Sequence, residues 1–193
     1  MTIILASGSP RRRELLEMLA GSCRLLICPA QGRENPPEGA GPAATVETLA
    51  LAKALEVAET RKAQQDEVII AADTIVWHQG RIYGKPHTKE EAYDMLSSLS
   101  GQTHEVYTGV TLVHNGTVVT EHECTYVTFR SLSDEEIHGY IATGEPMDKA
   151  GAYGAQGIGA LFVKHIEGDF FNAMGLPVCR LGEMLKKTGV KLI

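Results

Sequence analysis

The chain has 193 residues, with 18 Lys and Arg against 24 Asp and Glu, and its formal net charge is −6. A net negative charge argues against a nucleic-acid partner that binds to a broad basic face. Apolar residues make up 44% and charged residues 22% of the chain, which is typical of a globular protein with an ample core. We therefore expect one domain over residues 1–193.

The sequence shows no leader of charged residues followed by an apolar stretch. It also contains no apolar run that approaches the length of roughly twenty residues that a membrane helix needs. These features predict a cytoplasmic protein without a membrane partner. The four cysteines have no CxxC spacing and no histidines at zinc-site spacing, so we expect reduced thiols. The stretch 121–124, Glu-His-Glu-Cys, resembles a metal site, but it alternates faces in a strand pattern and is interpreted as strand surface.

A short apolar run over residues 3–6 predicts a buried strand, followed by a Ser-Gly-Ser turn and a helix that begins at Pro10 and continues to Leu19. Ser9 is the expected cap of this helix. Free backbone N–H groups and the helix dipole make such a turn a natural anion site, which would include Ser7.

Three consecutive arginines, Arg11, Arg12 and Arg13, occupy the first turn of this helix. Cations are unfavourable there, because they repel the helix dipole and one another. An anion between them would remove that cost, since guanidinium groups bind phosphate oxygens in pairs. The alternative interpretation is a basic helix start that is merely solvated.

The next elements are a strand over residues 24–28, a long Gly- and Pro-rich loop over 29–42 and a helix from Ala43 to about Lys62. The helix carries Lys53, which could be bound in a site or simply solvated. The continuous apolar run 68–72 predicts a strand buried on both faces that ends at Asp73. A carboxylate there is costly unless a charged group meets it.

The strand pattern resumes over residues 75–77, turns at Gln79-Gly80 and returns through residues 81–83 to Lys85, which is held between Gly84 and Pro86. Capping boxes at Thr88 and Ser133 predict two helices, the first ending at Gly101 and the second at about Ala142. Between them, residues 106–113 and 117–129 alternate apolar and polar around an Asn-Gly turn, which indicates an antiparallel hairpin.

Residues 147–157 contain so many glycines and alanines that we predict a loop whose backbone closely approaches a partner, not a core element and not a flexible linker. A buried strand over residues 161–163 and a terminal helix from Pro177 to about Lys187 follow. The predicted fold is α/β, mixed α+β: a central mixed sheet flanked by helices, with two lobes and a cleft lined by strand-end loops.

Cations and carboxylates together occupy the predicted strand-end loops. Cations bind polyphosphate oxygens, while carboxylates bind Mg²⁺ or accept a proton from water, as phosphoanhydride cleavage requires. No P-loop, HExxH or GxSxG pattern competes with this interpretation. The polar residues expected on these loops are Ser7, Arg11, Arg12, Glu34, Asp73, Lys85, Asp148, Lys149 and Gln156.

Five segments in order resemble the motifs of the Maf family, over nearly the whole chain. They are Leu5 to Arg12 (LASGSPRR), Ala72 to Thr74 (ADT), Gly84 to Pro86 (GKP), Thr108 to Val110 (TGV) and Asp148 to Tyr153 (DKAGAY). The resemblance implies a fold related to inosine triphosphate pyrophosphatase. It also implies a nucleoside triphosphate pyrophosphatase that releases pyrophosphate and a monophosphate, and so limits the incorporation of modified nucleotides into nucleic acids.

The loop from Asp148 to Gly157, with its later Gln156, resembles the branch acting on dTTP and UTP and differs from the branch acting on 7-methyl-GTP. By resemblance Asp73 is the catalytic carboxylate that accepts a proton. Arg11, Thr74 and Gln156 match positions tied to substrate choice. Further polar positions of the substrate pocket are matched by Glu34, Lys53 and Lys85; Glu38 is the alternative to Glu34.

Our mechanistic hypothesis is that Arg11, Arg12 and Lys85 hold the phosphates, while Mg²⁺ or Mn²⁺ neutralises charge and Asp73 activates water for attack at the α-phosphorus. Alternatively Asp73 is a metal ligand, together with Glu34. The hypothesis makes a small-molecule nucleotide the partner and leaves the oligomeric state open, with a homodimer as one candidate.

Two rival functions stay open. One is a nucleotide-sensing regulator of septum formation and cell division without significant hydrolysis, which needs the arginines but not Asp73. The other is an enzyme of the same fold that clears modified pyrimidine nucleotides such as 5-methyl-UTP or pseudouridine triphosphate.

Overall fold

The computed structural model describes residues 1–62 and 66–190. The chain divides into two compact units, each formed by segments that are distant in sequence. Unit 1 comprises Met1–Asp73, Thr108–Glu123 and Gly175–Ile193, and unit 2 comprises Thr74–Tyr107 and Cys124–Met174. The single domain and the cleft stay predictions.

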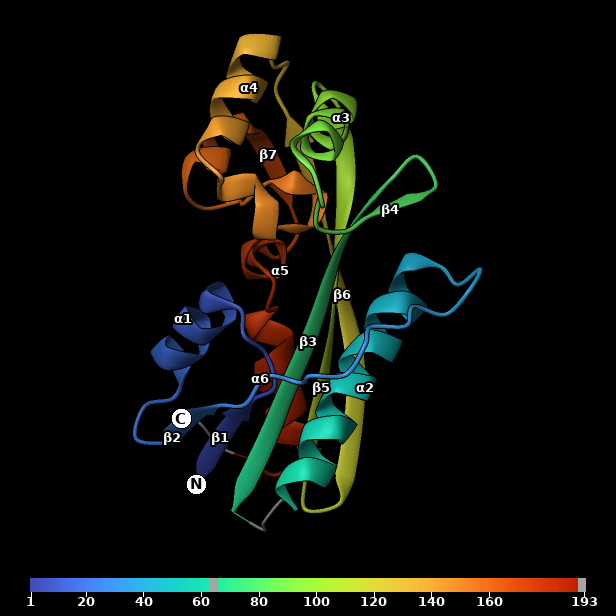
Figure 1. Cartoon of the computed structure of the whole chain (residues 1–193). Helices are drawn as coiled ribbons and strands as arrows, with labels where there is room; N and C mark the ends of the chain where they lie inside the picture. Colours follow the sequence, from blue (N-terminus) through green and yellow to red (C-terminus); the bar gives the residue numbers. More distant parts are fainter. Residues whose placement is uncertain (63–65, 191–193) are drawn as a thin grey trace. The chain divides into compact units, whose positions relative to one another are not determined.

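A seven-stranded sheet has the strand order β2-β1-β3-β5-β6-β7, with β4 paired to β3 (Figure 1). β1 is parallel to β2 and to β3, whereas β4 is antiparallel to β3 and β7 is antiparallel to β6. The expected mixed sheet is therefore confirmed. Its strands are β1 (Thr2–Leu5), β2 (Arg24–Ile27), β3 (Glu67–His78), β4 (Arg81–Tyr83), β5 (Thr103–His114), β6 (Thr117–Phe129) and β7 (Val163–Glu167).

The helices flank this sheet, and none in the described part of the chain is long and apolar enough to cross a membrane. Ser133 forms the complete predicted capping box with Glu136, while Thr88 accepts from the Glu91 N–H and Glu91 in turn accepts from the His87 N–H. The α-helices are α1 (Pro10–Leu19), α2 (Pro42–Arg61), α3 (Lys89–Leu99), α4 (Asp134–Ala142), α5 (Phe170–Met174) and α6 (Val178–Lys187); the 3₁₀ helices are η1 (Glu145–Asp148), η2 (Ala150–Ala152) and η3 (Ile158–Phe162).

In unit 1 the strand predicted to be buried on both faces is confirmed, since residues 68–72 of β3 have no exposed surface. Alternate residues of β1 and β3, among them Ile4 and Ile69, pack with Ala54 and Val57 of α2. This apolar contact fixes the helix that carries Lys53 against β3. The prediction that the strand ends at Asp73 is wrong, because β3 continues without a break to His78 and Asp73 lies near its middle.

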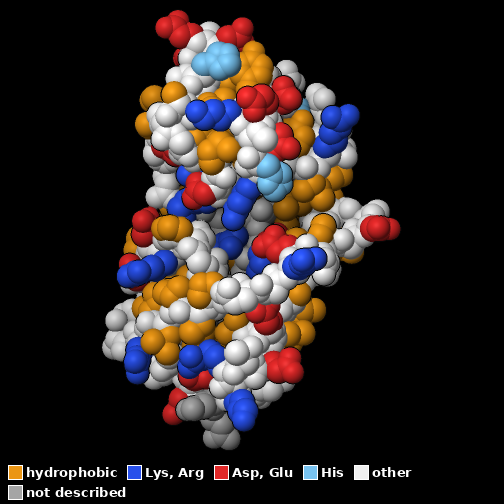
Figure 2. All heavy atoms as spheres, viewed as in Figure 1, with side chains coloured by type: hydrophobic (Ala, Val, Ile, Leu, Met, Phe, Trp, Pro, Cys, Tyr) orange, Lys and Arg blue, Asp and Glu red, His pale blue; other side chains and the backbone are white. Residues whose placement is uncertain are grey.

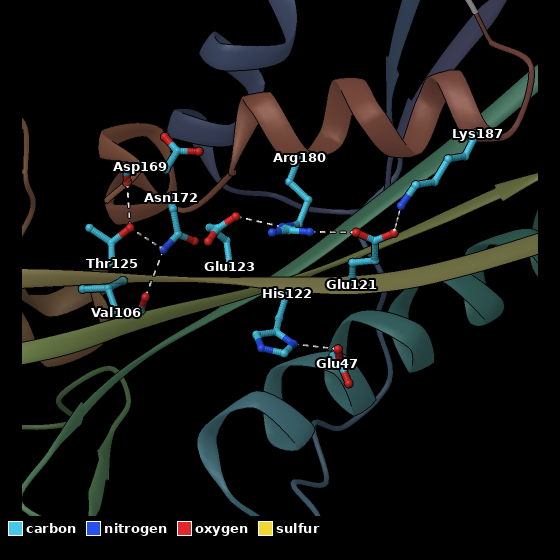
Figure 3. A network of polar contacts seen from close by, with 10 residues as sticks. All are labelled: Glu47, Val106, Glu121, His122, Glu123, Thr125, Asp169, Asn172, Arg180 and Lys187. Atoms are coloured by element: carbon cyan, nitrogen blue, oxygen red, sulfur yellow. Dashed lines mark hydrogen bonds and ion pairs between the residues drawn. The ribbon is translucent and has the colours of Figure 1, made fainter. Parts of the chain in front are cut away.

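Consecutive residues of β6 face opposite sides, as the sequence predicts. Glu121 and Glu123 accept hydrogen bonds from Arg180 of α6, whereas His122 lies 2.7 Å from Glu47 of α2 (Figure 3). The polar residues 121–123 are therefore strand surface that pairs with helices on both faces. No cluster of three or more metal-ligating side chains occurs within residues 1–62 and 66–190.

In unit 2 an aromatic core includes Phe129, Tyr140, Tyr153 and Phe162. Tyr153 belongs to the segment 147–157, and the prediction that this segment contributes nothing to the core is wrong: residues 151–153 are buried. The predicted strand over residues 161–163 is also wrong, because η3 extends to Phe162 and β7 begins only at Val163. A short continuous apolar run such as residues 161–163 does not by itself distinguish a 3₁₀ turn from a strand.

Gly109 of β5 lies against the backbone of α2. A Cβ at this position would lie 2.3 Å from the carbonyl oxygen of Val46 and 2.8 Å from the Glu47 nitrogen. Backbone atoms of a helix cannot yield as a flexible side chain does. The glycine of the Thr108-Gly109-Val110 motif therefore permits the close approach that brings α2 to the sheet.

We expect Gly109→Ala to lower the free energy of unfolding by about 1–3 kcal/mol, because α2 must move away from β5. Gly182→Ala is the matched control: a Cβ added to Gly182 in α6 would meet no heavy atom within 4 Å outside its own helix backbone and chain neighbours, so its replacement should raise stability by up to about 1 kcal/mol. Urea unfolding of both variants measures the difference. Equal stability of the two would contradict the packing argument.

His104 of β5 is a buried titratable group in unit 2. Its Nε2 lies 2.7 Å from the Tyr153 hydroxyl, and its ring packs edge-on against Phe129. Burial and, to a lesser extent, the charge of His78 lower the pKa of His104 from 6.5 to about 3. Between these values the unfolded chain binds a proton that the folded chain does not, so stability falls as the pH falls.

We expect the free energy of unfolding to decrease from pH 6.5 to pH 3, with His104 contributing up to about 1.4 kcal/mol per pH unit. His104→Asn should be less stable at pH 7 but should lose less stability over that interval. His138→Asn, at an exposed position of α4, should keep the wild-type slope. Unfolding measured at several pH values tests this, and identical slopes in all three proteins would refute it.

Candidate functional site

The turn between β1 and α1 is organised by Ser7 and not by Ser9. Ser9 occupies the N-cap position of α1, as expected, but its side chain makes no capping hydrogen bond. Instead the Ser7 hydroxyl accepts hydrogen bonds from the Ser9 N–H, at 3.3 Å, and from Nη1 of Arg12, at 3.0 Å. The turn thus orients the side chain of Arg12, which lies in the first turn of α1.

Arg12 is held at two points in unit 1. Besides its bond to Ser7, its Nε donates to the Gly175 carbonyl at 2.8 Å. Desolvation lowers the pKa of Arg12; the charge of Asp73 raises it, and the charge of Arg11 lowers it. Arg12 therefore lies within electrostatic reach of both Asp73 and Arg11.

Arg13 differs from Arg12. Its side chain is 59% exposed and pairs with Glu17, one turn along α1, at 2.7 Å. A solvated basic helix start therefore describes Arg13, whereas Arg12 is anchored and only partly exposed.

A cluster of one lysine and two carboxylates lies where β3 meets α2. Nζ of Lys53 is 2.5 Å from Oδ1 of Asp73 and 2.7 Å from Oε1 of Glu34. The side chains of Asp73 and Lys53 are 9% and 18% exposed, whereas that of Glu34 is 59% exposed. Lys53 is thus the charged partner that the buried Asp73 requires, and it meets Glu34 from the long loop.

Glu56 determines where that loop lies, a role that the sequence did not indicate. Its two carboxylate oxygens accept from the backbone N–H groups of Gln31, at 2.6 Å, and Gly32, at 3.0 Å. Glu56 follows Lys53 by three residues in α2, so both project from neighbouring positions of one helix. A charged residue on an amphipathic helix usually indicates only solvent exposure, which is why no sequence signal distinguished it.

The predicted site residues are distributed over both units. Unit 1 brings together Ser7, Arg11, Arg12, Glu34, Lys53 and Asp73. Unit 2 contains Thr74, Lys85, Asp148, Lys149 and Gln156. The roles of these residues toward a substrate stay predictions.

In unit 2, Lys149 and Gln156 have contrasting surroundings. Nζ of Lys149 donates to the Asp148 carboxylate at 2.6 Å and to the Glu145 carbonyl at 2.7 Å. The ammonium group of Lys149 is therefore paired with neighbouring residues of its own segment. Oε1 of Gln156 is buried and has no hydrogen-bond partner among the residues that the structure describes. Lys85 is exposed.

The surface charges are mixed in sign. Figure 2 shows Lys and Arg side chains interspersed with Asp and Glu over the visible face. A local cluster of cations beside carboxylates, as in unit 1, is the arrangement that suits a small polyanion.

The chain matches the family model described as "Maf-like protein" over residues 2–188. Proteins named dTTP/UTP pyrophosphatase from Bacillus anthracis and Bacillus cereus are each 47% identical over 188 residues, covering 97% of this chain and 96% of their own. A solved structure of a Vibrio cholerae protein aligns with 74% of this chain and 66% of its own at a TM-score of 0.39 and 7% identity, a similarity too low to inform the fold. The family match spans nearly the whole chain and includes both the arginine turn and Asp73, so the chain belongs to the Maf family.

Proposed function

We propose that the protein is a nucleoside triphosphate pyrophosphatase that hydrolyses dTTP and UTP to the monophosphate and pyrophosphate. The observation that carries the proposal is the buried Asp73 held by Lys53 beside the desolvated Arg12. The names of relatives at 47% identity support the substrates. Cations to hold a polyphosphate and a carboxylate to accept a proton are the groups that this reaction requires.

In the proposed reaction Asp73 accepts a proton from water as the water oxygen attacks the α-phosphorus. The bond between the α-phosphorus and its bridging oxygen breaks, and pyrophosphate leaves. Arg11, Arg12 and Lys85 bind the phosphate oxygens, and Lys53 keeps the Asp73 carboxylate in place. Asp73 as a metal ligand remains the alternative role.

The carboxylates of Glu34 and Asp73 fit a divalent cation. Mg²⁺ is usually bound through one or two carboxylates together with substrate phosphates and water, and these two carboxylates meet at one lysine. In the alternative role of Asp73, we propose that these two carboxylates would hold Mg²⁺ or Mn²⁺ when substrate is present. Such an ion would neutralise charge on the phosphates.

The unpaired oxygen of Gln156 supports a choice among pyrimidines. Uracil and thymine carry a donor at N3, whereas N3 of cytosine is an acceptor. The buried Oε1 of Gln156 has no partner in the described part of the chain. The N3–H of uracil or thymine could donate a hydrogen bond to it, whereas N3 of cytosine could not. Modified uracils that keep this edge, such as those of 5-methyl-UTP and pseudouridine triphosphate, would also be admitted.

We expect wild-type protein with Mg²⁺ to release pyrophosphate from dTTP and UTP in preference to CTP, GTP and 7-methyl-GTP, and to stop when the metal is chelated. Asp73→Asn should lower kcat by roughly two to four orders of magnitude, the effect of losing a general base. Asp94→Asn, at an exposed position of α3, is the control and should keep full turnover.

Near-normal turnover of Asp73→Asn would show that Asp73 is not the base. If the wild type binds nucleotide but releases pyrophosphate from none of the five, the nucleotide-sensing regulator becomes the better explanation.

We expect Arg12→Lys to weaken pyrophosphate binding by roughly tenfold, because a lysine cannot hold Ser7 and Gly175 while presenting a planar fork to phosphate. Arg13→Lys is a matched control one residue away, and its affinity should be unchanged because Arg13 pairs locally with Glu17. Titration calorimetry with pyrophosphate measures both. Equal losses in the two variants would mean that the anion site does not distinguish the anchored arginine.

A further inference from the structure

The backbone after Gln156 is unusual. Gly157 has φ 79° and ψ −153°, a combination that is essentially restricted to glycine. The chain then enters η3 at Ile158. A Cβ on Gly157 would lie 2.9 Å from both carboxylate oxygens of Glu145, so this carboxylate sits directly against the turn.

Glu145 binds the two N–H groups that follow this turn. Its Oε2 accepts from the Ile158 N–H at 3.1 Å, and its Oε1 accepts from the Gly159 N–H at 3.2 Å. Burial by itself raises the pKa of Glu145, but these bonds outweigh it and the net pKa lies below the ordinary value. The carboxylate therefore binds as an anion at the start of η3.

Tyr140 extends this contact to the residues before Gln156. Its hydroxyl donates to Oε1 of Glu145 at 2.9 Å and accepts from the Gly154 N–H at 3.3 Å. The ring is buried and packs edge-on against Phe162, with ring centroids 5.0 Å apart. The hydroxyl is thus fixed by the core of unit 2.

Together these bonds hold the loop on both sides of Gln156. Gly154 is anchored two residues before it, and Ile158 and Gly159 are anchored two and three residues after it. Both anchors come from α4 and η1, outside the loop itself. The Oε1 of Gln156, unpartnered among the described residues, lies within the segment so held.

We infer that Glu145 and Tyr140 are positioning residues for Gln156, which fix its amide for recognition of the pyrimidine edge. This inference rests on the proposed function. It separates binding from chemistry, because Asp73 is not part of this network. Loss of either anchor should therefore weaken substrate binding and base discrimination while leaving kcat nearly intact.

Tyr140→Phe removes one hydroxyl and keeps the ring, and Glu145→Gln keeps the shape and removes the charge. For each we expect KM for dTTP to rise roughly tenfold with kcat within about twofold, and the preference for dTTP over CTP in kcat/KM to fall roughly tenfold. Amide hydrogen exchange should also become faster at Ile158 and Gly159 in Glu145→Gln.

Two controls in unit 2 separate positioning from stability. Tyr93→Phe loses a comparable hydroxyl bond, to Asp134 at 2.8 Å, and Glu136→Gln disrupts the capping box at Ser133. Both should lower the melting temperature, and both should leave KM for dTTP and the preference for dTTP over CTP in kcat/KM at wild-type values.

Unchanged KM and unchanged preference for dTTP in Tyr140→Phe and Glu145→Gln, with an active wild type, would overturn the inference and leave the proposed function standing. A fall in kcat without a rise in KM would also overturn it. A wild type that cleaves none of the nucleotides would overturn the proposed function, and this inference with it.

Discussion

The ion pair between Asp73 and Lys53 is the interaction on which the polar chemistry of unit 1 depends. Asp73 directly follows the part of β3 that has no solvent exposure and is itself buried, and a carboxylate in such a place is unstable without a charged partner. Lys53 can be that partner because α2 packs against the sheet, which the absence of a side chain at Gly109 permits. A backbone contact thereby sets the position of a charge.

A second layer of contacts arranges the groups around this pair. Glu56 holds the long loop by two backbone N–H groups, and Glu34 from that loop reaches Lys53. Ser7 and the Gly175 carbonyl hold Arg12. These contacts fix the directions in which Arg12 and Glu34 present their charges, as binding of a polyphosphate would require.

Unit 2 uses a different device for the same purpose. The loop that contains Gln156 has little side-chain volume of its own, and its order comes from Tyr140 and Glu145 in the neighbouring helices. Small residues allow the backbone to come close to the aromatic core, and hydrogen bonds from outside the loop then replace the missing side-chain packing. This explains how a segment rich in glycine can be buried.

The sequence by itself determined the features that depend on neighbouring residues: the buried run 68–72, the Ser133 capping box and the arginines at the start of α1. It placed Asp73 at the end of a strand, whereas β3 continues to His78. The hydrophobic period and the capping of a helix depend on residues close in sequence, so they can be predicted without knowing which distant segments meet. The resemblance to the family motifs then indicated which residues to expect in the candidate site.

Only the tertiary structure decided which groups meet. It paired Lys53 with Asp73 and Glu34, made Ser7 the residue that organises the arginine turn, and replaced the predicted strand over 161–163 with η3. Lys53 and Asp73 are 20 residues apart in sequence, and the bond from Arg12 to the Gly175 carbonyl spans 163 residues. Such contacts form when packing brings distant segments together, and local sequence patterns do not encode them.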